Sequence, residues 1–208
     1  AVSDVGRWLS ARIQYGADGR LVGLAEALLG ELHDREGKAL RGRNADAEAV
    51  TRLGDRYIVA FERDYRLDSY AIGNWREPFP GPARRHTFPA DLKDAPANGG
   101  IEGLTALPGD RLLAIAEDLE EGEGHARAWL FDSGSWQRMK YQWIGRYRVS
   151  DLTLLPDNDI LVLERRFTWL GGFASRIAHV PLAAMVPGAT LRGEEIAVID
   201  PPLTTENF

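Results

Sequence analysis

Short apolar runs, broken by glycine, proline, aspartate and asparagine, recur along this chain. The pattern is clearest in three segments, "VTRLGDRYIVAFE" (50–62), "LTALPGDRLLAIAE" (104–117) and "LTLLPDNDILVLE" (152–164). In each segment a threonine-containing apolar strand precedes a turn, and the strand after the turn ends on glutamate. Runs of this length bounded by turn residues predict antiparallel β-hairpins rather than helices.

The three hairpins belong to a repeat. Their shared threonines, Thr51, Thr105 and Thr153, are separated by 54 and then 48 residues. A period near 50 residues made of strands is typical of a β-propeller or array, in which each repeat is a small sheet that packs against its neighbours. The sequence therefore predicts an all-β fold, a β-propeller built from four-stranded antiparallel blades.

Further strands complete the predicted blades. The segment "ARAWLFDSGSWQRMKY" reads as a hairpin with a Ser-Gly turn, and "FASRIAHVPLAAM" and "EEIAVID" alternate like outer strands. Residues 1–24 are expected to supply the last three strands of an earlier blade, with a turn at Asp18-Gly19. Residues 25–45 are expected to form an insertion with a short helix.

The predicted organisation is a single propeller domain over residues 1–208, with about four blades. The chain opens on "AVSD" and closes on "TTENF", which resemble a strand already under way and the start of a new unit. We therefore expect both ends to be truncated relative to a closed fold, and six blades in the full protein.

Composition excludes several classes of function. The chain has 208 residues and a formal net charge of −6, which argues against a nucleic-acid-binding protein with a basic face. No apolar run approaches the roughly 20 residues of a membrane span. The absence of cysteine excludes disulfides, thiol nucleophiles and cysteine-bound metals.

Acidic residues flank each predicted hairpin at its open end. Reflection about the turns pairs Glu48 with Glu62, Glu102 with Glu117, and Asp151 with Glu164, while Asp4 takes the place of Glu62 in the earlier blade. The first strand of a propeller blade lines the central channel, so these acids are predicted to surround one mouth of it. Their repulsion has to be offset by a proton, an arginine or a metal ion.

A hard cation is one solution to this repulsion. Carboxylate oxygens without cysteine favour Ca²⁺ or another divalent cation, and we predict Glu48, Glu102 and Asp151 as its ligands. The alternative is that each acid caps a turn or forms a local ion pair, as the adjacent arginines in Glu62-Arg63 and Glu164-Arg165-Arg166 permit. Both interpretations stay open at this point.

An arginine-rich segment offers a site for an anion. "RRFTWLGGFASR" (165–176) contains Arg165, Arg166 and Arg176 with aromatic residues and a Gly-Gly pair, and guanidinium groups match phosphate geometry. The alternative is a twisted strand connection whose arginines face water.

With these residues the chain resembles the phytase-like family described as having esterase-like activity of phytase. The resemblance rests on "AVSDVGRWLSARI", "FPGPARRHTFP", "GGIEGLTALPGDRLLAIAED", "VSDLTLLPDNDILVLERRFTWLGGFASRI" and "PPLTTENF". It implies a bacterial β-propeller, periplasmic or secreted, with a hydrolase label. It also places weight on a set of mouth residues: Glu48, Glu102, Asp151, Glu164, Arg165, Arg166 and Arg176, with Glu62-Arg63 as the equivalent strand end of an earlier blade.

The predicted function is hydrolysis of phosphate or carboxylic esters at this acidic mouth. Glu102, Asp151 and Glu164 are the candidate catalytic residues, and Arg63, Arg165, Arg166 and Arg176 are the candidates for binding a small anionic or ester substrate. One alternative is a lactonase-like sugar-acid hydrolase, which Asn44 and Asn98 would suit because each precedes a mouth glutamate by four residues. The other alternative is a non-enzymatic binding module.

Overall fold

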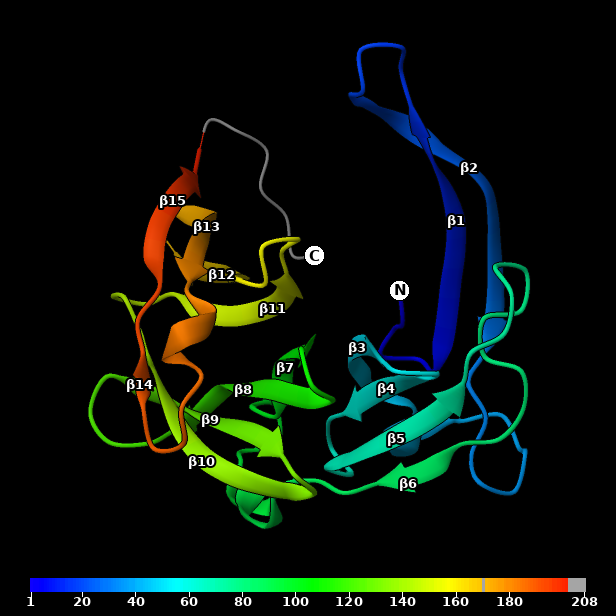
Figure 1. The fold of residues 1–208 in the computed structure, drawn as a ribbon, viewed down its shortest axis with the longest axis horizontal. Coiled ribbons are helices and arrows are strands. Elements are labelled where there is room, and N and C mark those ends of the chain that lie inside the picture. The colour runs from blue at the N-terminus through cyan, green and yellow to red at the C-terminus, as the bar shows by residue number, and fades with distance from the viewer. Residues whose placement is uncertain (170, 202–208) are drawn as a thin grey trace.

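The computed structural model describes residues 1–169 and 171–201, and it is an all-β structure with propeller-like blades. Three sheets and one hairpin surround a common centre (Figure 1). Within the described residues, no helix is long and apolar enough to cross a membrane.

Three sheets have the order expected of propeller blades. Blade 1 consists of β3 (Ala47–Leu53), β4 (Arg56–Phe61), β5 (Arg66–Ala71) and β6 (Arg84–His86). Blade 2 consists of β7 (Ile101–Leu107), β8 (Arg111–Glu120), β9 (His125–Asp132), β10 (Ser135–Gln142) and a parallel fifth strand, β14 (Thr190–Leu191). Blade 3 consists of β11 (Arg148–Leu154), β12 (Ile160–Thr168), β13 (Gly172–Val180) and β15 (Glu194–Ile199).

The predicted hairpin turns are confirmed. Gly109 and Asp110, Ser133 and Gly134, and Asn158 have positive φ angles, which the tight turns of hairpins require. The strands on either side of each turn pair antiparallel, with Leu107 opposite Arg111, Asp132 opposite Ser135 and Leu154 opposite Ile160. The glycine, aspartate and asparagine pattern thus identified these hairpins correctly.

The first 45 residues agree with the prediction at the Asp18-Gly19 turn, which joins two antiparallel strands, and differ from it elsewhere. They form a two-stranded hairpin of β1 (Arg7–Tyr15) and β2 (Leu21–Glu31), and residues 1–4 contribute only an isolated bridge between Val2 and Trp8. The expected insertion begins inside β2, because the apolar run there pairs with β1 instead of coiling. Its only helical turn is the 3₁₀ segment Gly42–Ala45, and two further 3₁₀ turns lie at Ala90–Asp94 and Leu182–Ala184.

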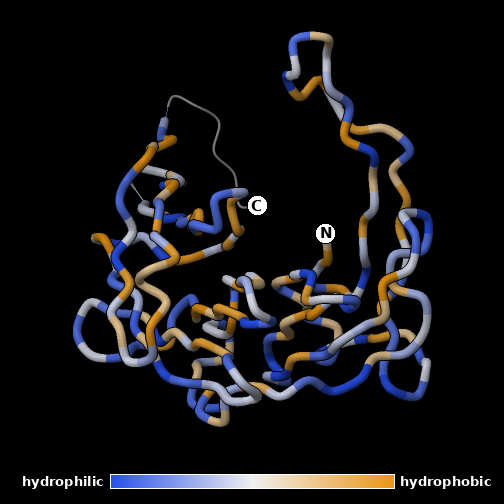
Figure 2. Tube along the Cα trace, viewed as in Figure 1, coloured by the Kyte–Doolittle hydropathy of each residue, from blue (hydrophilic) through white to orange (hydrophobic). Residues whose placement is uncertain are grey.

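The sheets stack face to face around three apolar cores. On β8, Leu112, Ala114 and Ala116 face the core shared with blade 1, whereas Leu113 and Ile115 face the core shared with blade 3. A strand covered on both faces reads as a continuous apolar run rather than an alternating one. Figure 2 shows this concentration of hydrophobic positions on the strands and long hydrophilic stretches in the peripheral loops.

The first strands of the three blades pack directly on one another at the centre. β7 contacts both β3 and β11 (Figure 1). Gly103 on β7 makes this closeness possible, because an added Cβ would lie 2.8 Å from Leu152 Cγ and 2.9 Å from Val149 Cγ1 on β11. The innermost strands are therefore fixed relative to each other by a contact that only glycine allows.

We expect Gly103→Ala to lower the free energy of unfolding by about 1–3 kcal/mol, because the added methyl group overpacks the contact between β7 and β11. For a chain of this size, each kcal/mol lowers the melting temperature by about 2–4 °C. Gly23→Ala is the matched control, since its Cβ would meet only one side-chain atom at an ordinary 3.6 Å. Equal melting temperatures for the two variants would contradict this interpretation.

Candidate functional site

Each blade carries a β-bulge at the same place in its first strand. The residue without a partner across the hairpin is Glu48 in blade 1, Glu102 in blade 2 and Ser150 in blade 3. All three lie three residues before the repeated threonine. A bulge leaves one residue outside the ladder of hydrogen bonds and re-aims its side chain.

The bulges also correct the predicted acidic pairs. Glu62 N donates to Asp46 O at 2.8 Å, and Glu117 N donates to Gly100 O at 2.9 Å. Glu164 stands opposite Val149. Each predicted partner lies two positions too close to the turn: one position comes from the bulge residue, and the other from the assumed centre of the turn.

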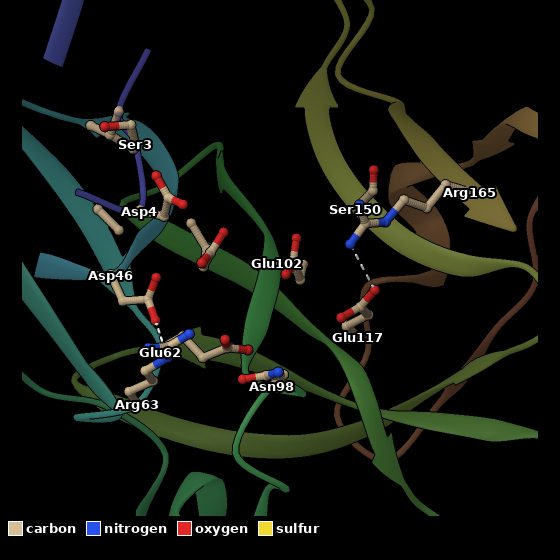
Figure 3. A pocket seen from close by; sticks show the side chains of 13 residues that line it. Ser3, Asp4, Asp46, Glu62, Arg63, Asn98, Glu102, Glu117, Ser150 and Arg165 are labelled. Atoms are coloured by element: carbon tan, nitrogen blue, oxygen red, sulfur yellow. Dashed lines mark hydrogen bonds and ion pairs between the residues drawn. The ribbon is translucent and has the colours of Figure 1, made fainter. Parts of the chain in front are cut away.

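The bulge residues face a pocket of about 540 Å³ at the meeting point of the blades and the N-terminal segment. Figure 3 shows its side chains. Six carboxylates line it: Asp4, Asp46, Glu48, Glu62, Glu102 and Glu117. The other lining residues are Arg63 and Arg165 and five uncharged residues, Val2, Ser3, Ala47, Asn98 and Ser150. Five of the six carboxylates, all but Asp46, are among the acids predicted to gather at one mouth.

One wall of the pocket gathers three carboxylates. One oxygen each from Asp46, Glu48 and Glu62 lie within 4.8 Å of one another, and Asp46 and Glu62 are buried. Glu62 Oε1 accepts a hydrogen bond from Gly100 N at 3.1 Å. Arg63 Nε lies 2.6 Å from Asp46 Oδ2 and forms an ion pair with it. These three oxygens can hold a metal ion.

The opposite wall carries an arginine. Arg165 Nη2 donates to Glu117 Oε1 at 3.1 Å, beside Ser150, and Glu102 lies between the two walls (Figure 3). Blade 3 therefore presents a neutral hydroxyl where blades 1 and 2 present glutamates. The pocket has an acidic side and a side on which a guanidinium is matched by one carboxylate.

Burial and mutual repulsion shift the protonation of the central glutamates. Burial, with help from Asp46 and Glu62, raises the pKa of Glu48 to about 7. Burial and the neighbouring charges of Glu117 and Glu48 raise the pKa of Glu102 to about 8. In the absence of a cation, Glu102 is therefore mostly protonated at neutral pH.

Several predicted site residues lie elsewhere. Asp151 is exposed, its Oδ1 accepts a hydrogen bond from Leu152 N at 2.7 Å, and it does not line the pocket. The expected ligand set of Glu48, Glu102 and Asp151 is therefore not assembled, because the bulge turns Ser150 inward instead. Nothing in the sequence marked Asp46 except its place two residues before Glu48, and only strict alignment on the threonines would have identified Ser150.

Glu164 and Arg176 form a buried ion pair inside blade 3. Glu164 is 0% exposed and also accepts a hydrogen bond from Tyr141 Oη at 3.0 Å, while Arg176 Nε donates to Glu195 at 3.0 Å. Arg166 does not line the pocket, and its guanidinium lies 5.3 Å from the Tyr147 ring centroid. Of the predicted arginines, Arg63 and Arg165 reach the pocket. Of the two asparagines noted, Asn98 lines it and Asn44 lines a different hollow.

The chain belongs to the phytase-like family. The family described as "Phytase-like: Esterase-like activity of phytase" matches residues 1–207. No curated protein matches the chain. One similar solved structure is the 1.35 Å crystal structure of a protein of unknown function from Bacteroides caccae, at 10% identity, covering 96% of this chain and 72% of that one, with a TM-score of 0.38.

The raised pKa of Glu102 predicts a fall in stability with rising pH in the metal-free protein. The unfolded chain ionises this group near pH 4.5, whereas the folded chain retains the proton up to about pH 8. Between these values the folded state binds more protons, so the free energy of unfolding decreases as pH rises. Thermal melting in a chelator should show a melting temperature several degrees lower at pH 8 than at pH 5.

Glu102→Gln should flatten this dependence, because the neutral amide does not ionise. The matched control is Glu123→Gln in the exposed loop after β8, which should leave the slope unchanged. A melting temperature that rises over this range, or a slope that Glu102→Gln leaves intact, would refute the burial argument for Glu102.

Proposed function

We propose that this protein is a hydrolase of phosphate or carboxylic esters that acts at the acidic pocket with a bound divalent cation. The observation that carries the proposal is the cluster of Asp46, Glu48 and Glu62 facing a wall with Arg165. The family description supports ester hydrolysis. Ca²⁺ is the first candidate, because oxygen-only ligands suit a hard cation.

The acidic wall fits such an ion on chemical grounds. Its three carboxylates lie together with one arginine against them, Arg63, which pairs with Asp46 Oδ2 at 2.6 Å. A divalent cation there would polarise an ester oxygen and lower the pKa of water. Asp46, Glu48 and Glu62 are its proposed ligands, in place of the set that the sequence predicted.

The remaining pocket residues have complementary roles in the proposal. Arg165 and the hydroxyl of Ser150 would hold the anionic or developing negative oxygen of the substrate, with Glu117 as the resting partner of the arginine. Glu102 would transfer the proton. A nearby cation lowers its pKa from about 8 towards neutrality, the range in which a carboxyl group exchanges protons effectively.

A lactonase-like activity on sugar acids is the second candidate. Asn98 lines the same pocket, so an amide oxygen is available beside the carboxylates. A binding module without catalysis is less well supported, because even with Glu102 protonated the remaining carboxylates of the lining outnumber its two arginines. We also propose a periplasmic or secreted location, as the family resemblance implies.

The test is hydrolysis of p-nitrophenyl phosphate, p-nitrophenyl acetate and D-glucono-1,5-lactone, with calcium and with a chelator. We expect calcium-dependent turnover of one ester class, and a fall in kcat of about a hundredfold in Glu102→Gln because the proton-transfer group is lost. Glu123→Gln is the matched control and should keep wild-type rates.

The outcome also separates the candidates. Turnover of the lactone alone would favour the lactonase. Absence of turnover on all three compounds, with and without calcium, would refute the hydrolase proposal and favour the binding module.

A further inference from the structure

A second hollow adjoins the acidic pocket. It measures about 330 Å³ and shares Asn98 and Glu117 with the pocket as walls. Four further residues complete its lining: Asp118, Arg146, Arg148 and Phe167. The two hollows are therefore adjacent. We call this second hollow the arginine groove.

The charges of the arginine groove leave one cation unmatched. Glu117 accepts a hydrogen bond from Arg165, and Arg148 Nε lies 3.4 Å from Asp118 Oδ1. The Arg148 guanidinium also lies 3.7 Å from the Trp143 ring centroid, which fixes its plane. Arg146 is exposed, and among the described residues its side chain has neither an ion-pair nor a hydrogen-bond partner. The lining thus holds two acids and two arginines, and Arg146 is the cationic group in it that is available to an anion.

The groove also has an apolar wall. Phe167 is 56% exposed, although its ring lies 4.8 Å from that of Phe173. An exposed aromatic face next to guanidinium groups suits a flat apolar group that carries a carboxylate or phosphate. A purely polar ligand would leave the Phe167 ring exposed to water.

We propose that the arginine groove binds the non-reacting part of the substrate, a flat apolar group with an anion at its far end. This inference rests on the proposed function, because it assigns the scissile ester to the acidic pocket next door. Arg146 is the specificity-determining residue for the distal anion, and Phe167 packs against the apolar group. A carboxylate and a phosphate share this chemistry.

Binding of two matched ligands, measured by isothermal titration calorimetry with calcium and with a chelator, tests the inference without turnover. The probes are phenylphosphonate and 4-carboxyphenylphosphonate, which differ only in the distal anion. We expect the carboxylated compound to bind about two- to fivefold more tightly, the effect of one solvent-exposed ion pair with Arg146. Arg146→Gln should abolish this preference and leave the affinity for phenylphosphonate unchanged.

Two further variants complete the design. Phe167→Ala should weaken both compounds by a similar factor. Arg20→Gln, at the exposed turn between β1 and β2, is the matched control and should keep the preference. Equal affinities in the wild type, a preference that survives Arg146→Gln, or binding of neither compound would overturn the inference.

The two proposals fail separately. If the preference depends on Arg146 but no ester is hydrolysed, the groove stands as a binding site and the hydrolase proposal falls. If esters are hydrolysed and Arg146→Gln changes neither affinity nor KM for carboxylated substrates, the hydrolase stands and the groove falls. A higher affinity for 4-phosphonophenylphosphonate than for the carboxylate would identify phosphate as the preferred distal anion.

Discussion

Repulsion among carboxylates held in a half-buried space is the interaction on which the chemistry of this pocket depends. The acids cannot move apart freely, because β3, β7 and β11 pack on one another and each bulge fixes the direction of its side chain. In water these groups would ionise near pH 4. Here the electrostatic cost is relieved by protons on Glu48 and Glu102, by Arg63, or by a cation.

The two walls of the pocket differ in charge because blade 3 departs from the repeat at one position. Blades 1 and 2 place Glu48 and Glu102 at the bulge, whereas blade 3 places Ser150 there. Arg165 forms its ion pair with Glu117 and also lies close enough to Glu102 to lower the pKa of that carboxyl group. A cation on one wall and an anion on the other are compatible with this arrangement, which a ring of identical glutamates would not provide. The arginine groove extends the same polarity beyond the pocket.

Much of the fold could be predicted from local sequence, because a tight turn needs particular residues and a hairpin needs two apolar strands. The turns at Gly109, Ser133 and Asn158 are examples. The hairpin turn at Asp18-Gly19 was predictable, but the extension of β2 through residues 25–31 was not, since "AEALLGEL" fits a helix as well as a strand and only the pairing with β1 decides between them. The parallel addition of β14 to blade 2 depends on contacts distant in sequence and left no local signal.

The sequence predicted that acidic residues would gather at one site, but it identified only some of the residues that line the pocket. Glu48, Glu102, Arg63 and Arg165 could be found from the repeat and reach the pocket. The prediction named Asp151 in place of Ser150, although only Ser150 matches the spacing of Glu48 and Glu102 from the repeated threonine, and the one-residue bulge decides which of the two neighbours points inward. Glu164 looked equivalent to Glu62, yet it is enclosed by Arg176 and Tyr141, a partnership that depends on blade packing.

Thermal melting during calcium titration tests the central claim most directly, because a ligand that binds only the native state raises the melting temperature. The account predicts a rise with Ca²⁺ in the wild type and in Glu123→Gln, and a much smaller rise in Glu48→Gln, which removes one carboxylate of the Asp46–Glu48–Glu62 cluster. Melting temperatures unaffected by Ca²⁺, Mg²⁺ and Mn²⁺, or a rise that Glu48→Gln leaves unchanged, would contradict it.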